Sequence, residues 1–207
     1  MTESERHSHW QTVYRTKGER DVSWFEDSPQ ISLQLIRATG IGKDAAVLDI
    51  GGGASRLADA LLHDGFADVT VLDLSEQALA IARARLGALG EKVHWIASDV
   101  TAWEPPRSYD VWHDRAAFHF LTEPADRAAY AERVLRAVRP GGHVIIGTFA
   151  LDGPERCSGL PVVRHDAASL GRMLGRSFTL LESRTVSHRT PAGAIQRFQF
   201  SRFRRAR

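Results

Sequence analysis

The sequence predicts an α/β fold, a doubly wound and mostly parallel sheet, formed by a single domain of 207 residues. Short apolar runs alternate with stretches of helical spacing, which is typical of parallel strands joined by right-handed crossovers. A glycine-rich turn at residues 51–53 joins one apolar run to a helical stretch. Hydrophobic residues at 43% and charged residues at 25% are ordinary for a globular domain with a full core.

The expected elements follow from this spacing and from turn and capping residues. Ser28 and Pro29 mark a helix start, and Ser75 marks another. Residues 139–142, Arg-Pro-Gly-Gly, are expected to form a turn that ends a helix. The predicted order is helices 5–16 and 28–39, strand 46–50, helix 54–64, strand 69–73, helix 75–89, strands 93–97 and 110–113, helix 125–138, strand 143–149, a helix near 166–174, and two antiparallel strands flanking residues 190–193.

Composition excludes several classes of protein. The chain has no run of ~18 apolar residues that could cross a membrane, and its polar beginning is unlike a signal peptide. Cys157 is the one cysteine, so we expect no disulfide and a cytoplasmic setting. No Cys/His cluster has the spacing of zinc ligands, so no metal is expected.

The glycine turn and the acids around it indicate a nucleoside-containing cofactor. A dinucleotide fingerprint requires glycine where Arg56 stands, which disfavours a nicotinamide cofactor. Asp49, just before the turn, would repel a pyrophosphate and suits a cationic, amino-acid-bearing ligand. Asp73 ends the next apolar run, close to the roughly 20-residue interval expected for an acid on ribose hydroxyls. Asp99 follows the third run and can accept a hydrogen bond from an adenine amino group.

Five segments occur in one order and spacing: VLDIGGG, VTVLDLS, HWIASDV, YDVWHDR and LRAVRPGGHVIIGTF. Over residues 40–150 the chain therefore resembles the class I S-adenosylmethionine-dependent methyltransferases, although Ser55 stands where many members have a third glycine. The resemblance implies a Rossmann-like sheet of seven strands whose last strand is antiparallel, with S-adenosylmethionine as cofactor and S-adenosylhomocysteine as product. It also implies a helical lid at 1–40, a cofactor-binding core at 41–150 and a sheet-completing part at 151–207. The cofactor-binding residues it implies are Trp10, Tyr14, Asp49, Gly51, Gly52, Gly53, Arg56, Asp73, Leu74, Asp99, Val100 and Asp114.

The segment YDVWHDRAAFHFL is similar to the D-[KR]-G-[TA]-[LF] segment of two branches of this family. One branch comprises methyltransferase-like protein-lysine methyltransferases, and the other comprises thiopurine, thiol and halide S-methyltransferases. In both branches an N-terminal helix folds over the cofactor, although the aromatic residues here could simply pack that helix onto the sheet. The expected substrate and lid residues are Trp24, Phe25, Arg115 and Phe118.

Three residues are candidates for catalysis: Asp114, His113 and His119. Methyl transfer needs a general base only when the acceptor must lose a proton. Asp114 could instead cap the turn that follows its strand or orient the cofactor. His119 stands between two phenylalanines, so packing is as good an interpretation for it as catalysis.

For the methyl acceptor we expect a small-molecule nucleophile such as a thiol or an amine, and a monomeric or homodimeric protein. A protein lysine is the alternative, for which Glu19, Asp21, Glu26 and Asp27 could form an acidic rim. A non-catalytic nucleotide-binding module is the alternative from another class. Nucleic acid is disfavoured because no Asn/Asp-Pro-Pro-Tyr motif follows the fourth strand. The arginines between residues 186 and 207 are interpreted as a solvated terminal strand.

Overall fold

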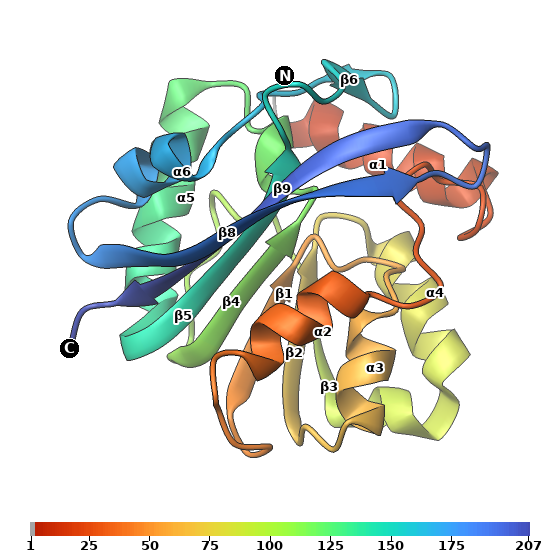
Figure 1. Cartoon of the computed structure of the whole chain (residues 1–207). Helices are drawn as coiled ribbons and strands as arrows, with labels where there is room; N and C mark the ends of the chain where they lie inside the picture. The colour runs from red at the N-terminus through yellow and green to blue at the C-terminus, as the bar shows by residue number, and fades with distance from the viewer. Residues whose placement is uncertain (1–2) are drawn as a thin grey trace.

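The computed structural model describes residues 3–207 and contains one seven-stranded sheet with helices on both faces (Figure 1). The strand order is β3-β2-β1-β4-β5-β9-β8. Pairing is parallel from β3 to β5, whereas β9 pairs antiparallel with both β5 and β8. This confirms the predicted mostly parallel sheet with an antiparallel last strand. The strands are β1 (Ala46–Ile50), β2 (Asp68–Asp73), β3 (Val93–Ala97), β4 (Tyr109–Arg115), β5 (Val138–Phe149), β8 (Phe178–Arg189) and β9 (Ile195–Arg205), besides a small separate pair, β6 (Arg156–Cys157) and β7 (Leu160–Pro161).

Two hydrophobic layers sandwich the sheet, because successive residues of a strand point to opposite faces. Val47 and Val111 pack with apolar residues of α2 and α3 on one face. Leu48 and Trp112 pack with α5 and α6 on the other. The helices are α1 (Glu3–Thr16), α2 (Gln30–Arg37), α3 (Leu57–His63), α4 (Glu76–Leu86), α5 (Pro124–Ala137) and α6 (Ala167–Leu174), with short 3-10 turns at Gly87–Lys92 and Phe118–Phe120. None of these helices is long and apolar enough to span a bilayer.

The three largest differences from the expected element boundaries lie in α3, β5 and α4. Helix α3 begins at Leu57 rather than at residue 54, because the turn after β1 continues through residues 51–56. The expected turn at 139–142 lies within β5. There the register jumps from Tyr109–Val138 to Val111–His143, so the extra residues bulge out of the ladder with β4. Helix α4 ends at Leu86, and a 3-10 turn replaces its expected last residues.

Helix α1 lies across the carboxyl-terminal edge of the sheet. Arg6 reaches Asp99 after β3, while Gln11 accepts a hydrogen bond from the hydroxyl of Ser75 after β2 at 2.8 Å. Trp10 contacts Phe120, which follows β4, with ring centroids 4.9 Å apart. The helix therefore covers the strand ends at which open α/β sheets bind their ligands.

Candidate active site

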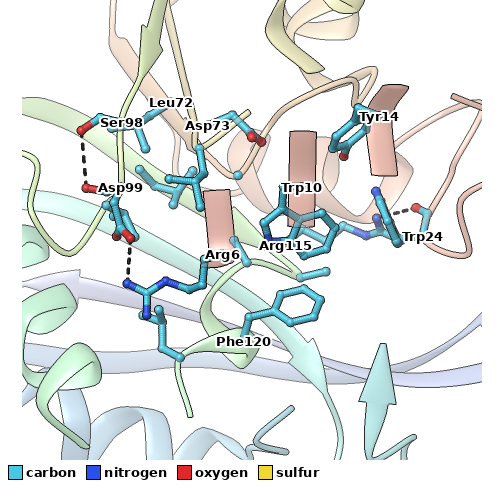
Figure 2. Close-up of a pocket in the computed structure, with 17 residues that line it drawn as sticks. Arg6, Trp10, Tyr14, Trp24, Leu72, Asp73, Ser98, Asp99, Arg115 and Phe120 are labelled. Carbon is cyan, nitrogen blue, oxygen red and sulfur yellow. Dashed lines mark hydrogen bonds and ion pairs between the residues drawn. The ribbon is translucent and has the colours of Figure 1, made fainter. Parts of the chain in front are cut away.

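A cavity opens at the carboxyl ends of β1, β2, β3 and β4, beneath helix α1 (Figure 2). Asp73 and Asp99 lie on its sheet side, and Arg6, Trp10 and Tyr14 of α1 form the opposite wall. The cavity has a volume of about 110 Å³ and is partly open to solvent.

The glycine turn after β1 lets two carboxylates pack directly against its backbone. Gly51 and Gly53 adopt φ values of +63° and +40°, in the left-handed region that favours glycine. A Cβ on Gly53 would lie 2.7 Å from Oδ2 of Asp73, and one on Gly52 would lie 2.5 Å from Oδ2 of Asp49. Glycine is therefore favoured by the backbone conformation at Gly51 and Gly53, and by the neighbouring acids at Gly52 and Gly53.

Asp73 is buried at the end of β2, and its carboxylate is hydrogen-bonded to the backbone that follows it. Its Oδ1 accepts a hydrogen bond from the N–H of Ser75 at 2.7 Å. Burial raises the pKa of Asp73 to about 7, and the nearby Asp49 adds to this rise, although backbone N–H groups oppose it. Leu74 and Val100, both predicted cofactor neighbours, line the same cavity.

Asp99 forms an ion pair with Arg6 across the cavity, with 2.8 Å between Oδ2 and Nη2 (Figure 2). Arg6 also contacts Asp126 of α5 at 2.7 Å, so it ties α1 to two elements. Burial alone would raise the pKa of Asp99, but hydrogen bonds from Thr101 and Arg6 outweigh it and lower the pKa. Arg6 could not be predicted as a site residue, because a single arginine in a polar helix gives no signal of its distant partners.

Aromatic side chains form the outer wall of the cavity. Trp10 lies 5.6 Å from Trp24 between ring centroids, and Tyr14 lies 6.3 Å from Trp24. Phe120, which sequence analysis did not select, completes this aromatic wall. Phe25 lies outside it, in an adjoining hollow, where the Arg56 guanidinium is 5.6 Å from its ring.

Arg115 stands between the cavity and the adjoining hollow and lines both. Its Nη1 donates to the carbonyl of Trp24 at 2.8 Å, and its Nη2 lies 3.0 Å from Oε1 of Glu26. Burial lowers the pKa of Arg115, whereas Glu26 raises it. The ring of Phe198 lies 5.1 Å from the guanidinium carbon. Arg115 therefore places a fixed positive charge beside the aromatic wall.

Comparisons with known proteins agree on one family. Residues 47–142 match the family model described as "Methyltransferase domain". The ubiquinone biosynthesis O-methyltransferase of Vibrio cholerae serotype O1 is 32% identical over 139 residues, which cover 61% of this chain and 54% of that protein. The chain thus spans about half the length of the curated relatives it matches. Residues 47–142 are therefore similar to a methyltransferase domain, in agreement with the resemblance to the class I S-adenosylmethionine-dependent methyltransferases.

Solved structures resemble this chain over nearly its whole length. One, from work on the conversion of a disulfide bond into a thioacetal group during echinomycin biosynthesis, has a TM-score of 0.76 and 25% identity, covering 97% of this chain and 93% of that one. The N-methyltransferase NodS of Bradyrhizobium japonicum WM9, solved with S-adenosyl-L-homocysteine, has a TM-score of 0.68 and 18% identity, covering 96% and 99%. The latter likeness shows the shared fold.

The structure does not bring Asp114 or Phe118 to the cavity. Oδ1 of Asp114 accepts from the N–H groups of Ala117 and Phe118, both at 3.1 Å, and Oδ2 accepts from the hydroxyl of Tyr130 at 2.8 Å. Burial raises the pKa of Asp114 to about 6. Phe118 is fully buried, with its ring centroid 4.7 Å from that of Tyr130. Asp114 therefore caps the turn after β4, which is the structural alternative considered for it.

The two candidate histidines lie in different surroundings. His119 is fully buried beside Phe149, whose N–H lies 3.4 Å from its Nδ1. Burial, together with His165 and Arg115, lowers the pKa of His119 to about 3, so its imidazole is neutral. His119 does not line the cavity, whereas His113 lines the adjoining hollow together with Asp49 and Arg56. Arg56 is paired there with Glu19 at 2.6 Å.

Proposed function

We propose that the chain transfers a methyl group from S-adenosylmethionine to a small-molecule nucleophile such as a thiol or an amine. The observation that carries this proposal is the convergence of Asp73, Asp99 and the glycine turn on one cavity. Acids at the ends of two neighbouring strands match the hydroxyls of a ribose and the amino group of an adenine. S-adenosylmethionine would supply a methyl group that its sulfonium has already activated.

The donor set of the site suits this cofactor. Oδ2 of Asp49 is buried and has no hydrogen-bond partner among residues 3–207, so a cationic ammonium group would satisfy it. Asp73 lies beside Gly53 at the base of the cavity, where it can accept from ribose hydroxyls. The aromatic wall of Trp10, Tyr14, Trp24 and Phe120 would exclude water and hold the acceptor in line with the methyl group.

Charge at the site favours a small acceptor over a protein lysine. Every acid of the expected acidic rim already has a partner. Glu19 pairs with Arg56 and Arg85, Glu26 pairs with Arg115, Asp27 pairs with Arg20, and Asp21 accepts from the N–H of Gly18. The ion pair of Arg115 with Glu26 likewise offers a lysine ammonium group no uncompensated negative charge at the aromatic wall. A neutral acceptor does not need such a charge.

The cavity also indicates an acceptor that needs little help from a base. Asp73 and Asp99 are the carboxylates among the described residues that line it, and both are assigned to the cofactor. A thiol or an amine reaches a nucleophilic state in water more readily than an alcohol does. The sulfur chemistry of the structural neighbour at 25% identity is consistent with this choice. The curated relatives are named ubiquinone biosynthesis O-methyltransferases, so the acceptor atom in their name is oxygen, and the test therefore includes phenols.

The test is methyl uptake from S-adenosylmethionine labelled on its methyl carbon. Wild-type protein is incubated with separate panels of thiols, heteroaromatic amines, phenols and lysine-containing peptides, beside the Trp24→Ala variant. Label in thiols or amines, reduced by Trp24→Ala, is the expected result. Label in peptide lysines instead would establish the alternative acceptor. Binding of S-adenosylhomocysteine without transfer to any panel would contradict the proposed acceptor classes.

A further inference from the structure

A buried chain of three polar side chains lies in the hollow next to the cofactor cavity. Nδ1 of His113 is 2.7 Å from Oδ1 of Asp49, and Nε2 of His113 is 2.8 Å from Oγ of Ser32. Ser32, His113 and Asp49 are 1%, 2% and 2% exposed. Burial of a polar side chain costs free energy unless hydrogen bonds satisfy it. Apolar packing alone therefore does not account for polar residues at these three positions.

The fold brings these residues together from three separate elements. The parallel register of β1 and β4 pairs Asp49 directly with His113, so both side chains point to the same face of the sheet. Helix α2 covers that face and places Ser32 over the imidazole. Ile50 follows Asp49 in β1 and Asp114 follows His113 in β4, and both face the opposite layer. The Ser32–His113–Asp49 chain is therefore a product of the sheet register.

The donors and acceptors of this chain can be assigned by elimination. An ionised carboxylate only accepts, so Nδ1 of His113 carries the hydrogen that it donates to Asp49. Nε2 of His113 in turn lies within hydrogen-bond distance of the hydroxyl of Ser32, which is able both to donate and to accept. One oxygen of Asp49 is thereby fixed. The other, Oδ2, stays beside the backbone of Gly52 with no partner among the described residues.

We infer that His113, held by Ser32, is a positioning residue that aims Oδ2 of Asp49 at the ammonium group of the cofactor. This inference rests on the proposed function. The N–H of His113 fixes the rotation of the carboxylate, and the hydroxyl of Ser32 fixes the ring that carries this N–H. His113 itself does not touch the reacting atoms.

If His113 positions Asp49, its loss weakens only ligands that carry the amino-acid part of the cofactor. A general loss of protein stability would not distinguish between such ligands and others. S-adenosylhomocysteine carries the ammonium group, whereas 5′-methylthioadenosine has the same nucleoside and lacks the whole amino-acid part. Loss of the donor to Asp49 should weaken the first ligand by roughly ten- to a hundredfold, as expected for a hydrogen bond to a charged group. It should leave the second ligand nearly unchanged.

The experiment measures dissociation constants of both ligands by calorimetry for wild type, His113→Leu, His113→Asn and Ser32→Ala. His113→Leu is expected to lose affinity for S-adenosylhomocysteine alone. His113→Asn is expected to recover most of it, because its amide can still donate to Asp49. Ser32→Ala is expected to lie between them, and it keeps the strand intact should His113→Leu fail to fold. His94→Asn, at an exposed histidine of β3, is the matched control.

Two results would overturn the inference. Equal weakening of both ligands would assign His113 and Ser32 a purely structural role. Unchanged affinity for S-adenosylhomocysteine in both His113→Leu and Ser32→Ala would remove the chain from cofactor binding. Wild-type protein that binds neither ligand would instead overturn the proposed function, and the inference with it, so the two failures are distinguishable.

Discussion

Replacement of Asp73 by alanine removes the carboxylate that we assign to the ribose. In the structure Oδ1 of Asp73 accepts from the N–H of Ser75 at 2.7 Å, and Oδ2 lies beside Gly53 at the base of the cavity. A hydrogen bond to a charged group contributes about 1.5–3 kcal/mol. At about 1.36 kcal/mol for each factor of ten, this predicts S-adenosylhomocysteine binding about ten- to 150-fold weaker than in wild type.

The assay is calorimetric titration at pH 8, where Asp73 is ionised because its pKa is about 7. Glu76→Ala, at an exposed acid in the first turn of α4, is the matched control and should bind as wild type does. Wild-type affinity should fall as the pH drops from 8 to 6, and Asp73→Asn should flatten this dependence. A dissociation constant that Asp73→Ala leaves unchanged would refute the assignment of Asp73 to the cofactor.

Three further predictions concern stability and the glycine turn. Tyr130→Phe should lower the free energy of unfolding, measured in urea, by about 1–3 kcal/mol, because buried Asp114 loses a hydrogen-bond donor. Cofactor affinity should not change, and weaker cofactor binding would contradict the structural role of Asp114. Burial raises the folded-state pKa of Asp73 to about 7, above about 3.9 for an unfolded aspartate, so the folded chain holds the extra proton between these values. Ligand-free Asp73→Asn should therefore gain stability relative to wild type as the pH rises from about 4 to about 7, and a constant difference would contradict the raised pKa. Gly52→Ala should lose cofactor binding, because the added Cβ would lie 2.5 Å from Oδ2 of Asp49 and 2.7 Å from Val71. Wild-type affinity in this variant would show that the Asp49 carboxylate can move.

Much of the fold could be predicted from local sequence signals. The strands of the sheet are apolar runs bounded by turn residues, and Asp73 and Asp99 follow such runs directly, so their meeting at one edge follows from parallel pairing. The bulge within β5 could not be predicted, because the Arg-Pro-Gly-Gly segment gives the same signal for a turn between elements. Its pairing depends on β4, which lies far away in the sequence.

The site was harder to predict where it depends on the face of a strand or on a distant partner. His113 and Asp114 are neighbours in β4, yet one faces Asp49 and the other faces Tyr130 on the opposite layer. Which face is which depends on the register with β1, and an apolar run does not reveal it. Arg6 meets Asp99 only because α1 folds across the strand ends. A polar helix carries no periodic signal for such docking.

The most direct measurement is calorimetric titration of S-adenosylmethionine and S-adenosylhomocysteine into the wild-type protein. Micromolar binding of both, with one site for each chain, is the expected result, because Asp49, Asp73 and Asp99 line the two adjoining hollows at the same edge of the sheet. Absence of binding by both would contradict a methyltransferase that uses this cavity, and would show that the fold serves another ligand.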